Sequence, residues 1–203
     1  MARVSKDEIL KACINGIEKS FNEYLEWSYG EWLWNAPEYL LTVNIAKELW
    51  NIEKEAKFIT LEDNIRYTLK NADAKIEDEL PNTARGNGRS DIIFWWGKGT
   101  PRGIIEVKNA VYQKKQIEKD LERIYAVLKK DSDIEFGVVA FYIDRHFKSG
   151  NAEENIRKRI EEKFKINIEK EASEKGFKAK HRVKKIEERD NDAAYAVAFM
   201  IYK

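Results

Sequence analysis

The stretch GRSDIIFWWGKGTPRGIIEVKN, residues 88–109, decides how the middle of this chain is built. Residues 90–96 and 103–108 are rich in Ile, Phe, Trp and Val, which are common in β-strands. The connecting GKGTP consists of residues that form turns. The stretch therefore predicts two strands joined as a hairpin.

Three charged residues, Asp91, Glu106 and Lys108, interrupt these apolar runs. Charged groups inside apolar strands are costly unless they are paired or bind a ligand. Side-chain alternation puts Glu106 and Lys108 on one face of the second strand, and hairpin pairing brings the start of the first strand near them. The three residues are therefore predicted to meet at one site, or else to form a solvated strand face with a cross-strand ion pair.

The composition narrows the class of protein. The chain has 203 residues, 43% of them hydrophobic and 36% charged, which suits one domain with a sizeable core. Lys and Arg total 37 against 36 Asp and Glu, so overall charge does not indicate a polyanionic partner. A single cysteine, no apolar run near 18 residues and no signal sequence lead us to expect a cytoplasmic protein without a membrane segment.

Helical and strand periodicities divide the rest of the chain. The predicted helices cover 6–27, 36–52, about 60–72, 113–130 and a segment that starts at 151, and the predicted strands cover 74–81, 90–96, 103–108, 135–143 and 193–202. The lysine-rich segment 177–190 is predicted to be a charged connection. This order predicts an α/β (α+β) fold with a mixed central sheet flanked by helices.

The charged hairpin is suited to phosphodiester hydrolysis with Mg²⁺. This cation takes oxygen ligands and keeps several waters, so two carboxylates from Asp91 and Glu106 and the carbonyl of Val107 are sufficient candidates. The ion would lower the pKa of a bound water and neutralise charge on the phosphate. Lys108 would orient the water or stabilise the transition state.

The spacing of an acid, any residue and then lysine is not specific, because it occurs four times in this chain. Three of the occurrences, which end at Lys57, Lys75 and Lys163, fall on predicted helices or their ends. Only Glu106–Lys108 lies in a predicted strand with an aspartate one hairpin upstream. The context of the motif therefore singles out this pair.

GRSDII (88–93) and EVKN (106–109), followed by a helix that carries QIEKDLERI (116–124), resemble the PD-(D/E)XK, or restriction-endonuclease-like, nuclease superfamily. The predicted order of a helix, a three-stranded meander, a helix and a strand over 36–143 is similar to the core of that superfamily. On this reading residues 1–203 are a single nuclease-like domain, with a helical extension at 6–34 and a C-terminal helix and strand at 151–203. One departure from the motif is Ser90, which stands where the motif's name has proline.

The resemblance implies roles for particular residues. Asp91 and Glu106 would bind Mg²⁺, which Mn²⁺ can replace, and Lys108 would be the catalytic lysine. An acid from the preceding helix would join them, with Glu38 the best match and Glu62 the second. A polar residue from the following helix would complete the site, with Gln116 the better match and Asp120 the poorer one.

The implied function is a Mg²⁺-dependent deoxyribonuclease, with an endonuclease favoured over an exonuclease. DNA would be the substrate, and the protein would act as a homodimer or as a subunit of a larger complex. The alternative is a catalytically idle nuclease-fold module that binds DNA or a partner protein. A third reading is an interaction protein in which the hairpin charges are only solvated.

Several residues have two interpretations at this stage. Glu38 forms a capping box with Asn35, or it points to the sheet from the apolar side of its helix. Gln116 is a surface residue or part of the site. Trp27, Trp32 and Trp34 either fasten two helices together or stack on bases, and residues 175–185 either bind a DNA backbone or form an amphipathic edge. His146 and His181 are expected at the surface, and Cys13 is expected in the core.

Overall fold

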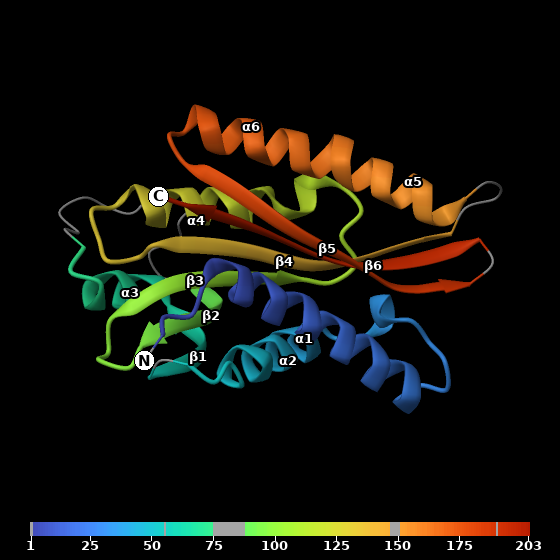
Figure 1. The fold of residues 1–203 in the computed structure, drawn as a ribbon, viewed down its shortest axis with the longest axis horizontal. Helices are drawn as coiled ribbons and strands as arrows, with labels where there is room; N and C mark the ends of the chain where they lie inside the picture. The colour runs from blue at the N-terminus through green and yellow to red at the C-terminus, as the bar shows by residue number, and fades with distance from the viewer. Residues whose placement is uncertain (1, 55, 75–87, 147–150, 190) are drawn as a thin grey trace.

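The computed structural model describes the chain except residues 1, 55, 75–87, 147–150 and 190 (Figure 1). Within the described part, a six-stranded mixed sheet has the strand order β1-β2-β3-β4-β6-β5. Neighbouring strands are antiparallel except β3 and β4, which are parallel. The strands are β1 Lys57–Asn64, β2 Arg89–Trp96, β3 Pro101–Lys108, β4 Phe136–His146, β5 Lys178–Arg189 and β6 Asp192–Tyr202.

Helices cover both faces of this sheet (Figure 1). α1 (Lys6–Trp27) and α2 (Glu38–Trp50) lie on one face, and α4 (Glu118–Lys129), α5 (Ala152–Arg159) and α6 (Ile166–Glu174) lie on the other. The shorter pieces are η1 Leu33–Asn35, α3 Ile65–Asn71, η3 Lys114–Ile117 and the π-helical turn η4 Ile160–Lys165. The predicted mixed sheet flanked by helices is confirmed. No described helix has the length and apolar character needed to cross a membrane.

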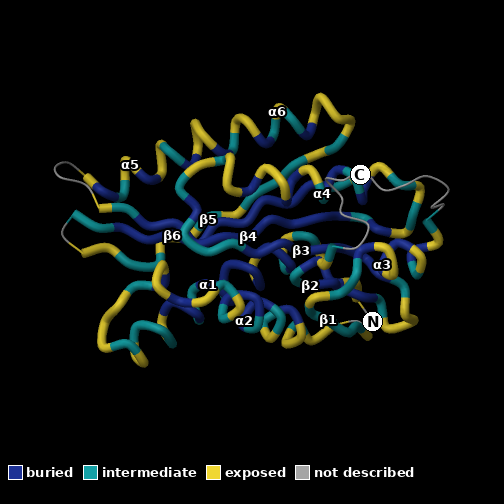
Figure 2. Tube along the Cα trace, turned by 180° about the vertical axis from the view of Figure 1, so that it is seen from behind, coloured by how far each residue is buried: buried dark blue, intermediate teal, exposed yellow. Residues whose placement is uncertain are grey.

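Strand alternation gives each face of the sheet its own core. Ile92 and Ile105 belong to the cluster under α1 and α2, whereas Ile93 and Ile104 belong to the cluster under α4. The central strands β4 and β6 are buried along nearly their whole length (Figure 2). Apolar strands covered on both faces read as continuous hydrophobic runs, as residues 136–143 and 193–202 do.

The first predicted helix is confirmed, and its start has a local cause. Ser5 accepts a hydrogen bond from the Glu8 amide at 3.2 Å, and Glu8 accepts one from the Ser5 amide at 2.9 Å. This reciprocal capping box satisfies two amide groups that the first helical turn leaves unpaired. The hairpin strands predicted at 90–96 and 103–108 are also confirmed as β2 and β3.

The helix predicted from residue 60 is wrong in its first half. Residues 57–64 form β1, which pairs with β2, and the helix starts only at Ile65. Asn64 supplies the helix cap, since its side chain accepts from the amides of Arg66 and Tyr67. The first strand of the meander is therefore β1, and the strand predicted at 74–81 lies outside the described residues from position 75 on.

The charged connection predicted at 177–190 is also wrong, because residues 178–189 form β5 at the edge of the sheet. Ala179 and Val183 pack on the core, and charged side chains alternate with them. Lysines on an edge strand discourage pairing with another chain. An edge strand that is only partly covered on one face has a composition similar to that of a polar loop. For this reason the sequence pattern did not predict β5 as a strand.

The predicted helix that starts near residue 151 is present with a π-helical turn at its centre. Its buried stripe repeats every four residues, at Ile156, Ile160, Phe164, Ile168 and Ala172. An α-helix has 3.6 residues per turn, so a strict four-residue repeat drifts around it. The wider π turn offsets this drift and keeps the stripe against the sheet.

Candidate functional site

The antiparallel pairing of β2 and β3 brings Asp91 and Glu106 together. The β2–β3 ladder includes Ile92 opposite Ile105, and Asp91 and Glu106 are the next residues beyond this pair. The Asp91 carboxylate accepts a hydrogen bond from the Val107 amide at 2.6 Å. The predicted convergence at the hairpin end is therefore present in the structure.

Glu106 is the most deeply buried acid of the group, with an exposed fraction of 1%. One of its oxygens, Oε2, forms an ion pair with Arg123 of α4. The other, Oε1, is buried and has no hydrogen-bond donor among the described residues. Burial raises the pKa of Glu106 to about 8, with Asp91 and Asp120 adding to the rise and with Arg123 and the Ser90 side chain opposing it.

Lys108 lies between two acids from different helices. Its Nζ is 3.1 Å from Oε1 of Glu38 on α2 and 3.8 Å from Oδ2 of Asp120 on α4. It also donates to the carbonyl of Val107 at 3.0 Å. Burial acts to lower the pKa of Lys108, but Asp120, Glu38 and Asp91 together outweigh burial and raise it. The ammonium group is therefore held in its charged form.

Glu38 joins the site from the first turn of α2. Besides Lys108, it accepts a hydrogen bond from the Asn109 amide at 3.0 Å. The interpretation of Glu38 as a capping-box partner of Asn35 is wrong, because the N-cap of α2 is Pro37 and Asn35 donates to Glu31 instead. An acid in the first turn is favoured by the helix dipole, and here it also reaches the sheet.

Glu62, the second candidate for the helix acid, lies on β1 and not on a helix. The β1–β2 ladder passes from Leu61 opposite Ile92 to Asp63 opposite Ser90, so Glu62 is left unpaired beside Asp91. Its φ of 54° is in the left-handed region, which is unfavourable for a residue other than glycine. Burial raises the pKa of Asp91, and the charges of Glu38 and Glu62 add to this rise.

The hydrogen bonds of the Gln116 side chain to described residues do not include Asp91, Glu106 or Lys108. This side chain accepts from the amides of Tyr112 and Gln113 at 2.7 and 2.9 Å and donates to the carbonyl of Ala110 at 3.2 Å. These bonds cap the 3₁₀ turn before α4. Asp120, the poorer sequence match, is the acid that α4 brings to Lys108.

Arg123 is the site residue that sequence reasoning missed. It bridges Glu106 and Asp120, with an Nη1–Oδ1 distance of 3.7 Å to the latter. The available signal was the spacing of Asp120 and Arg123, which are three residues apart on one helix. That signal is weak because such pairs are common on solvated helix surfaces.

The donor set fits Mg²⁺ in part. The described residues contain no group of three or more His, Cys, Asp or Glu side chains arranged to hold a metal ion. Mg²⁺ is usually held in proteins by one or two carboxylates and several waters. Asp91, the free Oε1 of Glu106 and the Val107 carbonyl are the groups that would bind it, and Arg123 supplies the positive charge now beside Glu106.

The remaining candidates have mostly structural roles. Trp32 packs edge-on against Phe21 with ring centroids 5.9 Å apart, as a fastener between helices should, whereas Trp27 and Trp34 are exposed. Lysines of β5 form ion pairs with acids, as Lys180 does with Asp7 and Lys184 with Glu18. Cys13 is fully buried in the core under α1.

Comparisons of the chain with protein-family models, with curated proteins and with solved structures found no match.

Proposed function

We propose that the protein is a metal-dependent nuclease that hydrolyses phosphodiester bonds of DNA. One observation carries the proposal: Asp91, Glu106 and Lys108 lie together at the ends of two paired strands, and a buried oxygen of Glu106 has no described donor. Buried acceptors are nearly always satisfied in native proteins, so an open carboxylate oxygen beside other acids suggests a cation ligand. The resemblance to the PD-(D/E)XK superfamily supports the same reading.

Mg²⁺, when bound by Asp91 and Glu106, would neutralise charge on the scissile phosphate and acidify a water molecule. Lys108 acts as a cationic hydrogen-bond donor and not as a base, since neighbouring acids raise its pKa. It stabilises the negative charge that builds up on the phosphate in the transition state. Glu38 and Asp120 hold the ammonium group in place.

The test is cleavage of supercoiled, linear and single-stranded DNA in Mg²⁺, in Mn²⁺ and in EDTA. Lys108→Ala should lower the rate by roughly 100- to 1000-fold, the usual effect of removing one preorganised donor. Lys163→Ala is the matched control, because Lys163 ends the same acid-x-lysine spacing on an exposed helical turn. Cleavage that persists in EDTA, or that Lys108→Ala leaves unchanged, would contradict the proposal.

A second candidate is a nuclease-fold module that binds DNA or a partner protein without cutting. The ion pair between Glu106 and Arg123 favours it, because Arg123 already compensates the carboxylate charge without a metal. Calorimetry with Mn²⁺ separates the two candidates. A nuclease site should bind Mn²⁺ in a way that Asp91→Asn removes, whereas an idle module should show no binding in either protein.

A further inference from the structure

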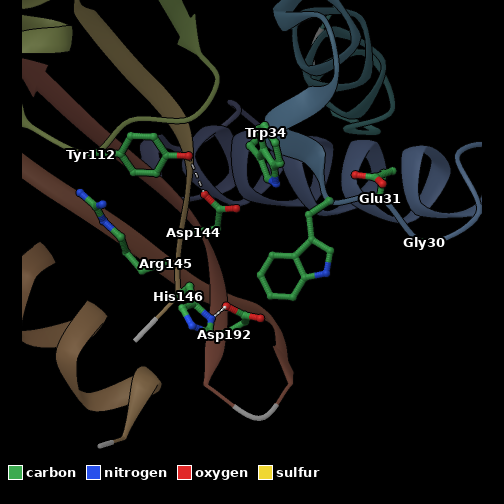
Figure 3. A pocket seen from close by; sticks show the side chains of 9 residues that line it. Gly30, Glu31, Trp34, Tyr112, Asp144, Arg145, His146 and Asp192 are labelled. Carbon is green, nitrogen blue, oxygen red and sulfur yellow. Dashed lines mark hydrogen bonds and ion pairs between the residues drawn. The ribbon is translucent and has the colours of Figure 1, made fainter. Parts of the chain in front are cut away.

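A groove of about 520 Å³ opens between the α1–α2 connection and the end of β4 (Figure 3). One wall comes from the α1–α2 connection and includes Glu31 and Trp34. The other comes from the end of β4, the start of β6 and the loop after β3, and includes Asp144, Asp192 and Tyr112. Its volume is in the range of small-molecule binding sites, about 300–1,000 Å³.

The groove is joined to the candidate site through the segment that follows Lys108. Asn109 donates from its side chain to the carbonyls of Leu33 and Ala36, each at 2.8 Å, and so fastens the Trp34 turn to the end of β3. Three residues later, the Tyr112 hydroxyl donates to Asp144 at 2.9 Å. A ligand in the groove would therefore contact Tyr112, in the loop that follows Lys108.

Trp34 places an exposed indole in the lining of the groove. Half of its surface is exposed (51%), although it lies on a short 3₁₀ turn whose neighbour Leu33 is fully buried. An exposed indole in a concave site is a platform on which a flat ring can stack. On the opposite wall, the Arg145 guanidinium lies 4.4 Å from the centroid of the Tyr112 ring.

The charges in the groove indicate which part of a nucleotide fits. Three carboxyl groups, those of Glu31, Asp144 and Asp192, line it with one arginine, Arg145, and with His146, which pairs with Asp192. This excess of acids repels a phosphate backbone. Among the described residues, each carboxylate bonds at least one neighbouring side chain at 2.8 to 2.9 Å, and a carboxylate can accept further hydrogen bonds. The amino groups of nucleobases are suitable donors.

We propose that this groove binds one unstacked nucleobase of the DNA substrate, stacked on Trp34 and hydrogen-bonded through its exocyclic amino group to the groove carboxylates. The inference rests on the proposed nuclease function for the identity of the ligand. It implies that the protein acts on DNA with an unpaired nucleotide, because a base inside a duplex cannot reach such a groove. Cytosine has both a flat ring that can stack and an exocyclic amino group that can donate, whereas thymine has no exocyclic amino group.

The test is fluorescence anisotropy with labelled single-stranded 12-mers in EDTA, so that binding is measured without cleavage. The probes are oligo-dC, oligo-dT and an abasic oligomer of the same length. Oligo-dC should bind roughly 5- to 150-fold more tightly than the abasic oligomer, which is the range expected for base stacking on one aromatic side chain. Oligo-dT should bind more weakly than oligo-dC.

Trp34→Ala should remove the preference for oligo-dC over the abasic oligomer, and Trp34→Phe should retain it. Trp50→Ala is the matched control, because Trp50 is similarly exposed (59%) but lies at the far end of α2. Equal binding of oligo-dC and the abasic oligomer, or an unchanged preference in Trp34→Ala, would overturn the proposal. Equal binding of oligo-dC and oligo-dT would overturn the role of the carboxylates. The binding assay does not require catalysis. Failure of the nuclease proposal would therefore be seen in the cleavage assay, and failure of the groove proposal would be seen in the binding assay.

Discussion

Glu106→Gln should change how the stability of the protein depends on pH. Glutamine keeps the shape of the side chain but has no ionisable group. In the wild type, burial raises the pKa of Glu106 from its ordinary value of 4.5 to about 8. The folded protein therefore holds this proton more tightly than the unfolded chain does, and folding takes up a proton between these two pH values.

The sign of the effect follows from this proton uptake. The stabilisation from the neutral Glu106 is fully present below pH 4.5 and is lost as the pH rises through about 8. At about 1.4 kcal/mol for each pH unit, the interval corresponds to about 5 kcal/mol, which is an upper limit because the buried site can relax. Relative to Glu106→Gln, the wild type should therefore become progressively less stable from pH 5 to pH 8.

The assay is urea unfolding of both proteins at each pH from 5 to 9. Glu122→Gln is the control, since it makes the same chemical change at an exposed position of α4. If wild type and Glu106→Gln give parallel curves, Glu106 is ionised throughout and its pairing with Arg123 outweighs burial. That result would refute the reasoning.

The same group links pH to metal affinity. A cation can bind Glu106 only after its proton has left, so Mg²⁺ should stabilise the wild type more at pH 8 than at pH 6, by up to tenfold in affinity per pH unit. Glu106→Gln should abolish this dependence. Thermal shifts at a series of Mg²⁺ concentrations measure it, and an unchanged pH dependence in the variant would remove Glu106 from the metal site.

Two further substitutions test the packing that supports the site. Asn109→Ala removes two hydrogen bonds of 2.8 Å to the α1–α2 connection, so unfolding in urea should show a loss of about 1–3 kcal/mol. Gly16→Ala would place a Cβ 2.5 Å from the Ile45 Cα, a backbone atom that cannot rotate away. The free-energy cost of overpacking, about 1–3 kcal/mol, should therefore exceed the gain of about 1 kcal/mol from replacing glycine with alanine in a helix, so the protein should become less stable. Asn22→Ala, an exposed change on α1, is the control for both, and losses no larger than in that variant would contradict the packing argument.

The sequence by itself determined the features that depend on local pattern. Alternation and turn residues were enough to predict β2 and β3 and to bring Asp91, Glu106 and Lys108 to one end of a hairpin. The capping box at Ser5 and Glu8 is equally local, because its partners are three residues apart. These features depend on φ/ψ preferences and side-chain direction within a few residues, which the order of amino acids sets directly.

Only the tertiary structure decided which other residues complete the candidate site. Glu38 reaches Lys108 across 70 positions of sequence, and Arg123 reaches Glu106 from α4, on one face of the sheet. Neither contact has a local signature, because helix packing on the sheet sets both. β5 was missed for the same reason: its polar strand is ordered by pairing with the apolar β6 and not by its own composition.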